Sequence, residues 1–296
     1  MKKFLLKSLT FFVTALIVLI IFWKFICFNR NEILKLPNDY NIVFLGNSHI
    51  EYTIDDSILK NSFNFARSAE RMEFIYCKIK LLKRYNTQLD TVVIGYDNVL
   101  LYKGADKAFD TNAYSPYYYD TYNFNDIIQI IRNSSFDYII SHFSWPFEWS
   151  KLVPIITQKD DENLNISNLT NIGGYKPLFR NKLIEDTKLK KNRVQHQTSF
   201  DALQLYFLNN AIEFCKKNNI TIIFLCPPQH DKCHLDKTFY KEFYSKNYSN
   251  IKFYDFRDMH LPDSCFGDLD HLNYKGARVF SEYLEKEVFH KKNYPQ

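Results

Sequence analysis

The segment Asn41-Ile-Val-Phe-Leu-Gly-Asn-Ser-His49 decides the fold that we predict for this chain. Its apolar residues, 42–45, suit a short strand buried on both faces, as the strands of a parallel sheet are. Gly46 then lets the chain turn sharply off the strand, and polar residues follow at once. In open parallel sheets, chemistry gathers beyond the carboxyl ends of the strands. The segment therefore indicates a functional site as well as a strand.

Short apolar segments and helical patterns then alternate along the chain. Further strands are predicted at 62–65, 91–95, 220–226 and 251–256, and helices at 69–85, 202–217 and 273–290. This alternation predicts an α/β fold with a parallel sheet and right-handed crossovers. The pattern breaks between residues 100 and 200, a stretch too long for a simple loop. We therefore expect one domain, 41–296, that carries a helical insertion or lid at 100–200.

The composition is that of a globular protein and argues against some functions. Of the 296 residues, 46% are apolar and 24% are charged, and the net charge of +5 is scattered, so we expect no nucleic-acid partner. The six cysteines form no Cys-x-x-Cys pair, and a bridge between Cys233 and Cys265 stays open. The spacing of Cys226, His230, Cys233 and His234 matches no common zinc pattern. We therefore expect no metal and no other cofactor.

The N-terminal residues predict a membrane anchor. Three lysines in residues 1–8 precede an apolar run at 9–28, and twenty residues of helix rise about 30 Å, the thickness of a bilayer core. No small-x-small cleavage site follows, which favours an uncleaved anchor over a signal peptide. The basic flank predicts a cytoplasmic N-terminus, so the linker 29–40 and the large domain lie outside the cell membrane.

Four polar segments stand at predicted strand ends or just before the last helix, at 46–49, 64–69, 95–98 and 268–273. The first contains Ser48, and the fourth contains Asp268 and His271. A serine hydroxyl needs an imidazole to take its proton, and the imidazole needs an acceptor on its other nitrogen. An Asp three residues before a His on one loop can bring its carboxylate back to the ring. These residues therefore form a candidate catalytic triad.

In order and placement the four segments resemble the blocks of the SGNH, or GDSL-type, hydrolase superfamily. The resemblance runs from about residue 41 to the C-terminus, except for the insertion, and implies a flavodoxin-like three-layer fold. It implies that Ser48 is the nucleophile, Asp268 the orienting acid and His271 the general base. The segment His-Leu-Asn-Tyr-Lys-Gly-Ala at 271–277 looks like that of membrane-anchored relatives that handle acyl groups on cell-surface polymers. Those relatives include polysaccharide O-acetylation proteins and the teichoic-acid D-alanylation protein.

The resemblance also implies an oxyanion hole made by Ser48, Ala69 and Asn98, with two departures from the family. Ala69 stands where the second block usually has glycine, and it serves if its backbone angles allow. The third block usually reads Gly-x-Asn-Asp, but here it reads Gly-Tyr-Asp-Asn at 95–98. An ionised Asp97 cannot donate to an oxyanion. Either Asn98 takes that role or only backbone amides remain.

We therefore expect a membrane-anchored, extracytoplasmic serine esterase or O-acyltransferase that acts on acyl groups, above all acetyl, of an envelope glycan or polymer. Its expected partners are that polymer, the membrane through 9–28 and a multi-span membrane acyltransferase. The alternative is a noncatalytic binding or assembly component of envelope polysaccharide modification whose altered third block has lost turnover. Three side chains keep two interpretations each. His49 orients the nucleophile loop or makes a structural hydrogen bond, and Trp145 and Trp149 stack on sugar rings or pack the insertion.

Overall fold

A five-stranded parallel sheet forms the centre of the computed structural model, which describes residues 2–101, 118, 120–143, 173–190, 199–233 and 238–289. Its strands are β1 (Ile42–Leu45), β2 (Ser62–Asn64), β3 (Thr91–Gly95), β4 (Thr221–Cys226) and β5 (Lys252–Asp255). The spatial order is β2-β1-β3-β4-β5, which is the flavodoxin-like arrangement. The predicted α/β class is confirmed, and all five strands lie at their predicted places.

The pairing of β1 brings three of the polar segments together. Phe44 pairs with Asn64 of β2 on one side and with Val93 of β3 on the other. Because all three strands run parallel and end at nearly the same level, the residues that follow them emerge at one edge of the sheet. The segments after β1, β2 and β3 are therefore neighbours in space.

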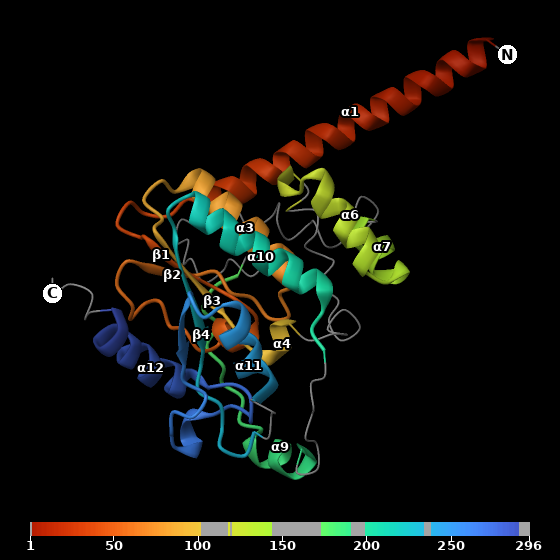
Figure 1. Cartoon of the computed structure of the whole chain (residues 1–296). Coiled ribbons are helices and arrows are strands. Elements are labelled where there is room, and N and C mark those ends of the chain that lie inside the picture. The colour runs from red at the N-terminus through yellow and green to blue at the C-terminus, as the bar shows by residue number, and fades with distance from the viewer. Residues whose placement is uncertain are drawn as a thin grey trace.

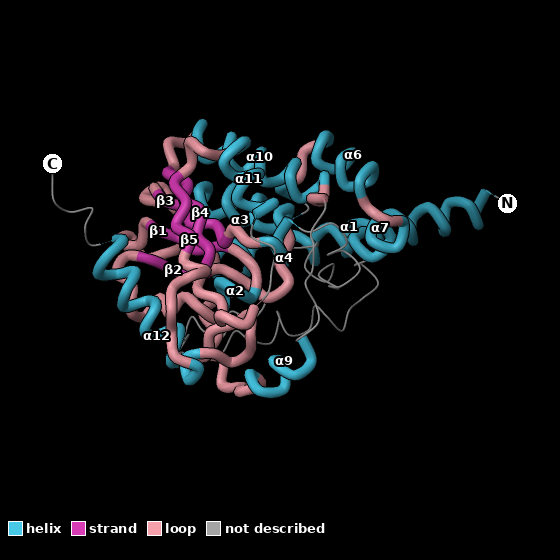
Figure 2. Tube along the Cα trace, turned by 60° about the horizontal axis from the view of Figure 1, so that its bottom comes forward, coloured by secondary structure: helices cyan, strands magenta, loops and turns pink. Residues whose placement is uncertain are grey.

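Helices cover both faces of the sheet (Figures 1 and 2). One face carries α3 (Met72–Tyr85), α10 (Ala202–Lys217) and α11 (Thr238–Asn247), and the other carries α12 (Tyr274–Tyr283). Along β1 the side chains alternate: Val43 and Leu45 pack into the core under the first helices, and Phe44 packs into the core under α12. Both faces are buried, which explains why the strand is apolar without a break.

Three helices differ from the prediction. The helix expected at 69–85 begins at Met72, because Ala69 has a φ of +60° and Arg71, the N-cap, has an extended backbone with a ψ of 159°. The helix expected at 273–290 is α12 up to Tyr283 and continues as one π-helical segment, η6 (Leu284–Phe289). The helix α11 was not predicted, although Tyr240, Phe243 and Tyr244 stand at the i, i+3, i+4 spacing of one helical face and pack into the core.

The described part of the predicted insertion is mostly helical. It contains α4 (Asn98–Leu101), α6 (Phe124–Asn133), α7 (Phe136–Phe143) and α9 (Leu183–Lys190). Residues 173–182 hold no helix and lead into α9. Trp145 and Trp149 lie outside the described residues, so their role stays a prediction. Tyr118 is 2% exposed and packs on Phe74 of α3, which makes it a core residue.

The N-terminal helix α1 (Lys2–Ile33) projects away from the sheet and its helices (Figure 1). Its residues Lys2–Ile21 are long and apolar enough to span a membrane or to serve as a signal sequence. The helix contains the predicted anchor, 9–28, and also the first residues of the predicted linker, 29–40. An uncleaved anchor and an outward-facing domain stay predictions.

Two glycines let the turn that carries Ser48 approach the sheet closely. A Cβ added to Gly95 would lie 2.4 Å from Ile50 Cγ1 and 3.1 Å from its Cδ1, and a Cβ on Gly46 would lie 2.8 Å from the same Cγ1. Ile50 is fully buried on the short helix α2 (Ser48–Glu51). Its side chain therefore seats α2, which carries Ser48, against the ends of β1 and β3.

The substitution Gly95→Ala should lower the free energy of unfolding by about 1–3 kcal/mol, the usual cost of overpacking a core. Urea unfolding of the full-length protein in detergent measures this difference. In an Ile50→Ala background the same change should cost clearly less, because the side-chain atoms that the new methyl group meets are gone. Equal costs in both backgrounds would show that Ile50 does not set the approach.

Candidate active site

Ser48 lies directly beyond β1, at the first position of α2. Asn47 caps this helix: its Oδ1 accepts a hydrogen bond from the His49 N–H at 2.9 Å. The amide of the same side chain donates to both carboxylate oxygens of Asp97, at 3.0 and 3.2 Å. The turn that presents Ser48 is thus held by its own cap and by the segment after β3.

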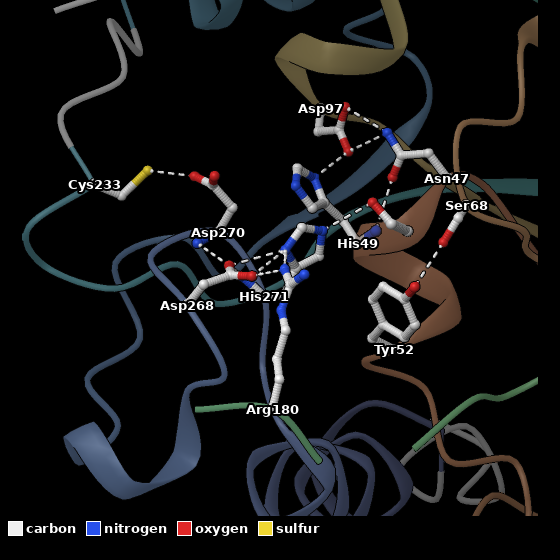
Figure 3. A network of polar contacts seen from close by, with 11 residues as sticks. Asn47, His49, Tyr52, Ser68, Asp97, Arg180, Cys233, Asp268, Asp270 and His271 are labelled. Carbon is white, nitrogen blue, oxygen red and sulfur yellow. Dashed lines mark hydrogen bonds and ion pairs between the residues drawn. The ribbon is translucent and has the colours of Figure 1, made fainter. Parts of the chain in front are cut away.

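Ser48, His271 and Asp268 form a continuous chain of polar contacts (Figure 3). Ser48 Oγ is 2.8 Å from His271 Nε2, although 223 positions separate the two residues in the sequence. His271 Nδ1 is 2.9 and 3.1 Å from the two carboxylate oxygens of Asp268. In this arrangement His271 can take the proton of Ser48 while Asp268 stabilises the imidazolium that results.

The local backbone holds Asp268 in place. Asp268 is buried, and its Oδ1 accepts the backbone N–H groups of Asp270 and His271 at 2.9 Å each. These bonds turn the carboxylate toward the imidazole of the same loop. Asp270 has a different partner, because its Oδ1 accepts a hydrogen bond from the Cys233 thiol at 3.1 Å. Asp268 therefore contacts the imidazole of His271, and Asp270 contacts the thiol of Cys233.

Arg180 is a site residue that the sequence analysis missed. Its guanidinium forms an ion pair with Asp268 Oδ2 and lies 3.5 Å from His271 Nδ1 (Figure 3). Its side chain is 43% exposed, so solvent screens much of this attraction. Arg180 stands in the predicted insertion and in no recognisable motif, and only the fold shows that it reaches the triad.

The segment around Arg180 runs along the site. Gly174 N–H donates to the carbonyl of Ala66 at 3.1 Å, after β2, and Lys176 N–H donates to the carbonyl of Glu51 at 3.1 Å, on α2. Lys182 N–H donates to the carbonyl of Gly267 at 2.7 Å, beside Asp268. Residues 173–182 therefore link the second polar segment to α2 and to the residue just before the fourth segment.

The second polar segment is fixed through Ser68. Its N–H donates to Glu51 Oε2 at 2.8 Å, and its hydroxyl contacts that carboxylate and Tyr52 Oη, the latter at 3.0 Å. The edge of the Tyr52 ring in turn packs against His271, with 5.5 Å between centroids. Ala69 follows with a φ of +60°, in the left-handed region that favours glycine. Ala69 thus makes the turn for which glycine is the usual residue.

The third polar segment presents Asp97. Its carboxylate accepts hydrogen bonds from Asn47 Nδ2, from the Leu100 N–H at 2.8 Å and from His49 Nδ1 at 2.7 Å. Burial opposes ionisation, but the contact with His49 and the other hydrogen bonds outweigh it, so the pKa of Asp97 lies below its usual 3.8. Asn98 begins α4, and its side chain lies outside the described part of the structure, so its oxyanion role stays a prediction.

Two minor alternatives from the sequence find no support in the described residues. No disulfide bond joins Cys233 and Cys265. Within residues 2–101, 118, 120–143, 173–190, 199–233 and 238–289, no group of three or more potential ligands could hold a metal ion. His234 lies outside this part of the chain.

Comparisons with known proteins give weak matches. A protein-family model matches residues 179–293, which include Arg180, Asp268 and His271 but not Ser48. No curated protein matches the chain. Similar solved structures include a GDSL-like lipase from Bacteroides thetaiotaomicron, with 13% identity over 89% of this chain and 95% of the lipase and a TM-score of 0.39. A proposed acylhydrolase from Bacteroides fragilis has 13% identity over 87% of this chain and 90% of its own, with a TM-score of 0.37.

These values are too low to support an argument about activity or family membership. The family model, moreover, spans less than half of the chain. What the site can do therefore follows from its own geometry.

Replacing Asp268 with Asn should slow acylation by an activated acetyl ester on the order of 10³–10⁴-fold, because the imidazole loses its tautomer and its charge partner. Asp270→Asn is the matched control and should stay within about twofold of wild type, because Asp270 contacts Cys233 instead of the imidazole. The burst phase of p-nitrophenyl acetate cleavage, followed at several pH values, gives both rates. The reverse ranking would make Asp270 the orienting acid.

Proposed function

We propose that this chain is a serine esterase or O-acyltransferase, and that Ser48, His271 and Asp268 are its catalytic residues. One observation supports this above the others: Ser48 Oγ lies 2.8 Å from His271 Nε2, and the opposite nitrogen of the same ring lies 2.9 Å from the buried Asp268. A nucleophile, a base and an orienting acid in line are what acyl transfer through a serine requires.

The reaction proceeds in two halves. Ser48 Oγ attacks the carbonyl carbon of the acyl ester, its proton passes to His271 Nε2, and the carbonyl electron pair moves onto the oxygen. The tetrahedral intermediate collapses, the alcohol leaves with the proton from His271, and the acyl group stays on Ser48. Water or a sugar hydroxyl then repeats these steps in reverse. Water gives hydrolysis and a sugar hydroxyl gives transfer.

Backbone N–H groups are the first donors that we assign to the oxyanion. Ser48 occupies the start of α2, where N–H groups have no partner within the helix. Ala69 has the left-handed backbone that the turn of the second segment requires. Removing one such donor from an oxyanion hole typically costs about 10²–10³ in rate. Asn98 completes the set in the proposal inferred from the family resemblance.

The acyl carrier that we propose is an envelope glycan or polymer, and the acyl group is acetyl. The resemblance of residues 271–277 to membrane-anchored relatives supports this choice. The apolar helix α1 also supports it, because an anchor at 9–28 would hold the site close to the outer surface of the membrane. A multi-span membrane acyltransferase would be the matching source of activated acyl groups.

An exposed aromatic pair beside the triad loop suits a sugar ring. Phe179 is 74% exposed and Tyr274 is 42% exposed, and their ring centroids are 5.1 Å apart. Phe179 precedes Arg180, which contacts Asp268, and Tyr274 follows His271 by three residues. Exposed aromatic faces of this kind mark interaction surfaces. We assign this pair to the binding of the glycan chain outside the reacting ester.

Ser48→Ala should abolish covalent labelling of the full-length protein by a fluorophosphonate probe, because the change removes the attacking oxygen. His271→Ala should slow labelling by at least about 10³-fold, since the same proton transfer is lost. Ser57→Ala is the control: its hydroxyl donates to Asp55 on the surface, and labelling should be unchanged. Intact-protein mass spectrometry reads out the adduct. A folded wild-type protein without label would be a noncatalytic binding or assembly component instead.

Phe179→Ala should lower kcat/KM for an O-acetylated polysaccharide about tenfold and leave p-nitrophenyl acetate cleavage unchanged, because only the polymer reaches the aromatic pair. Release of acetate measures the first rate. Phe124→Ala serves as the control, since Phe124 is equally exposed, at 76%, but belongs to α6. If the rates on both substrates fall equally, Phe179 supports the packing of the site and does not contact the glycan.

A further inference from the structure

A second Asp–His pair lies beside the triad. His49 Nδ1 is 2.7 Å from Asp97 Oδ2, and the two side chains are only 5% and 2% exposed. The centroid of the His49 ring is 4.9 Å from that of His271. Figure 3 shows His49 between Asp97 and His271. Because His49 directly follows Ser48, the pair belongs to the turn that carries the nucleophile.

The contacts of Asp97 fix one proton of His49. An ionised carboxylate has acceptor sites alone, so His49 Nδ1 must carry a proton toward Asp97. Asn47 Nδ2 and the Leu100 N–H fill further acceptor sites of the same carboxylate. Three donors on one carboxylate are the arrangement that favours its charged form. These contacts therefore place a proton on Nδ1 of His49.

The negative charge of Asp97 also favours a proton on the second ring nitrogen of His49, Nε2. A buried carboxylate is costly unless a cation and hydrogen bonds offset it. Among the described residues that hydrogen-bond to Asp97, only His49 can carry a positive charge. A proton on both ring nitrogens would make the pair neutral as a whole. Burial thus favours the ion pair over a lone charged carboxylate beside a neutral ring.

We propose that Asp97 holds His49 as an imidazolium, and that this buried ion pair stabilises the negative charge that forms on the carbonyl oxygen of the substrate when Ser48 is acylated. The inference rests on the proposed function and adds one stabilising group to the oxyanion donors proposed there, the backbone amides of Ser48 and Ala69 and the side chain of Asn98. When Ser48 Oγ bonds to the carbonyl carbon, its proton goes to His271 Nε2 and the carbonyl electron pair moves to oxygen. His49 keeps both of its protons throughout.

A buried charge is effective at this place because few water molecules screen it. Charges interact several-fold more strongly in a protein interior than in water. Oriented groups that already face the developing charge need no reorganisation during the reaction. His49 is almost fully buried and directly follows Ser48, so it meets the first condition. In the proposal its second ring nitrogen faces the developing charge and meets the other. The pair would therefore act from position 97 of the third segment, where the blocks of the resembled family usually have an asparagine and this chain has Asp97.

The same pair does not prevent His271 from taking a proton. An isolated imidazolium at 4.9 Å would oppose a second positive charge on His271, but Asp97 offsets it from behind and Asp268 supports His271 from the other side. A further titratable group near the pair is Tyr240 of α11, whose pKa is raised mainly by burial and also by the carboxylate of Asp97. Tyr240 stays a neutral phenol.

Nitrogen-15 spectra of the histidine rings test the charge directly. The full-length Ser48→Ala protein in detergent micelles cannot be acylated, and His49→Gln in that background assigns the His49 signals. At pH 7 we expect both ring nitrogens of His49 at imidazolium positions, and one unprotonated nitrogen after Asp97→Asn. An unprotonated Nε2 at pH 7 with Asp97 in place would overturn the proposal.

Acylation rates test the consequence. His49→Ala should slow the p-nitrophenyl acetate burst about 10²-fold, the loss expected for one oxyanion-stabilising group, with little change in KM. Asp97→Asn should cost a similar factor, and the combined variant little more, because the two residues act as one unit. The control is His260→Ala, since His260 also contacts an acid, Asp231 at 3.2 Å, but on the surface, and this change should have no effect.

The pH profile separates a charged role from a packing role. Acylation of the wild-type protein should slow at high pH, where the His49 imidazolium loses a proton. The His49→Gln variant keeps an amide donor but has no titrating ring. It should therefore be acylated faster than His49→Ala, and its rate should not fall at high pH. A His49→Gln profile that keeps the wild-type high-pH limb would overturn the proposal. So would a folded His49→Ala protein within about twofold of the wild-type rate. A wild-type protein that is not acylated at all would instead refute the proposed function.

Discussion

The parallel pairing of β1 between β2 and β3 is the constraint on which the rest of the structure depends. Phe44 pairs with Asn64 and Val93, so three strands deliver the segments that follow them to one edge. Ile50 then locks the first of these segments against the sheet, and only glycine at 46 and 95 leaves room for it. Without this register Ser48 would not meet the loop that carries His271.

Buried charge at this edge is satisfied twice in the same manner. Asp268 and Asp97 each accept backbone N–H groups and each face one imidazole. Such carboxylates are expensive to bury, and their hydrogen bonds and histidine partners offset that cost. The two pairs approach each other through the rings of His271 and His49. The chemistry of the site is therefore a matter of which imidazole holds which proton.

Local patterns in the sequence were enough to predict the sheet. Residues 42–45 are apolar without a break because both faces of β1 are covered, and the same logic located the four other strands. The helix start at Met72 could not be predicted, because the left-handed backbone of Ala69 is set by contacts of the second segment with α2. The helix α11 was missed although the sequence indicates it, because Tyr240, Phe243 and Tyr244 repeat at helical spacing and form the face that packs into the core.

The sequence by itself determined which residues could do the chemistry: Ser48 after a strand, and Asp268 three residues before His271 on one loop. A contact within three residues follows from local geometry, and so it is readable from the sequence. Only the tertiary structure decided that Ser48 reaches His271 across 223 positions, that Arg180 touches Asp268 and that His49 faces Asp97. These contacts join segments whose separation in space is set by sheet order and core packing, which no local pattern records.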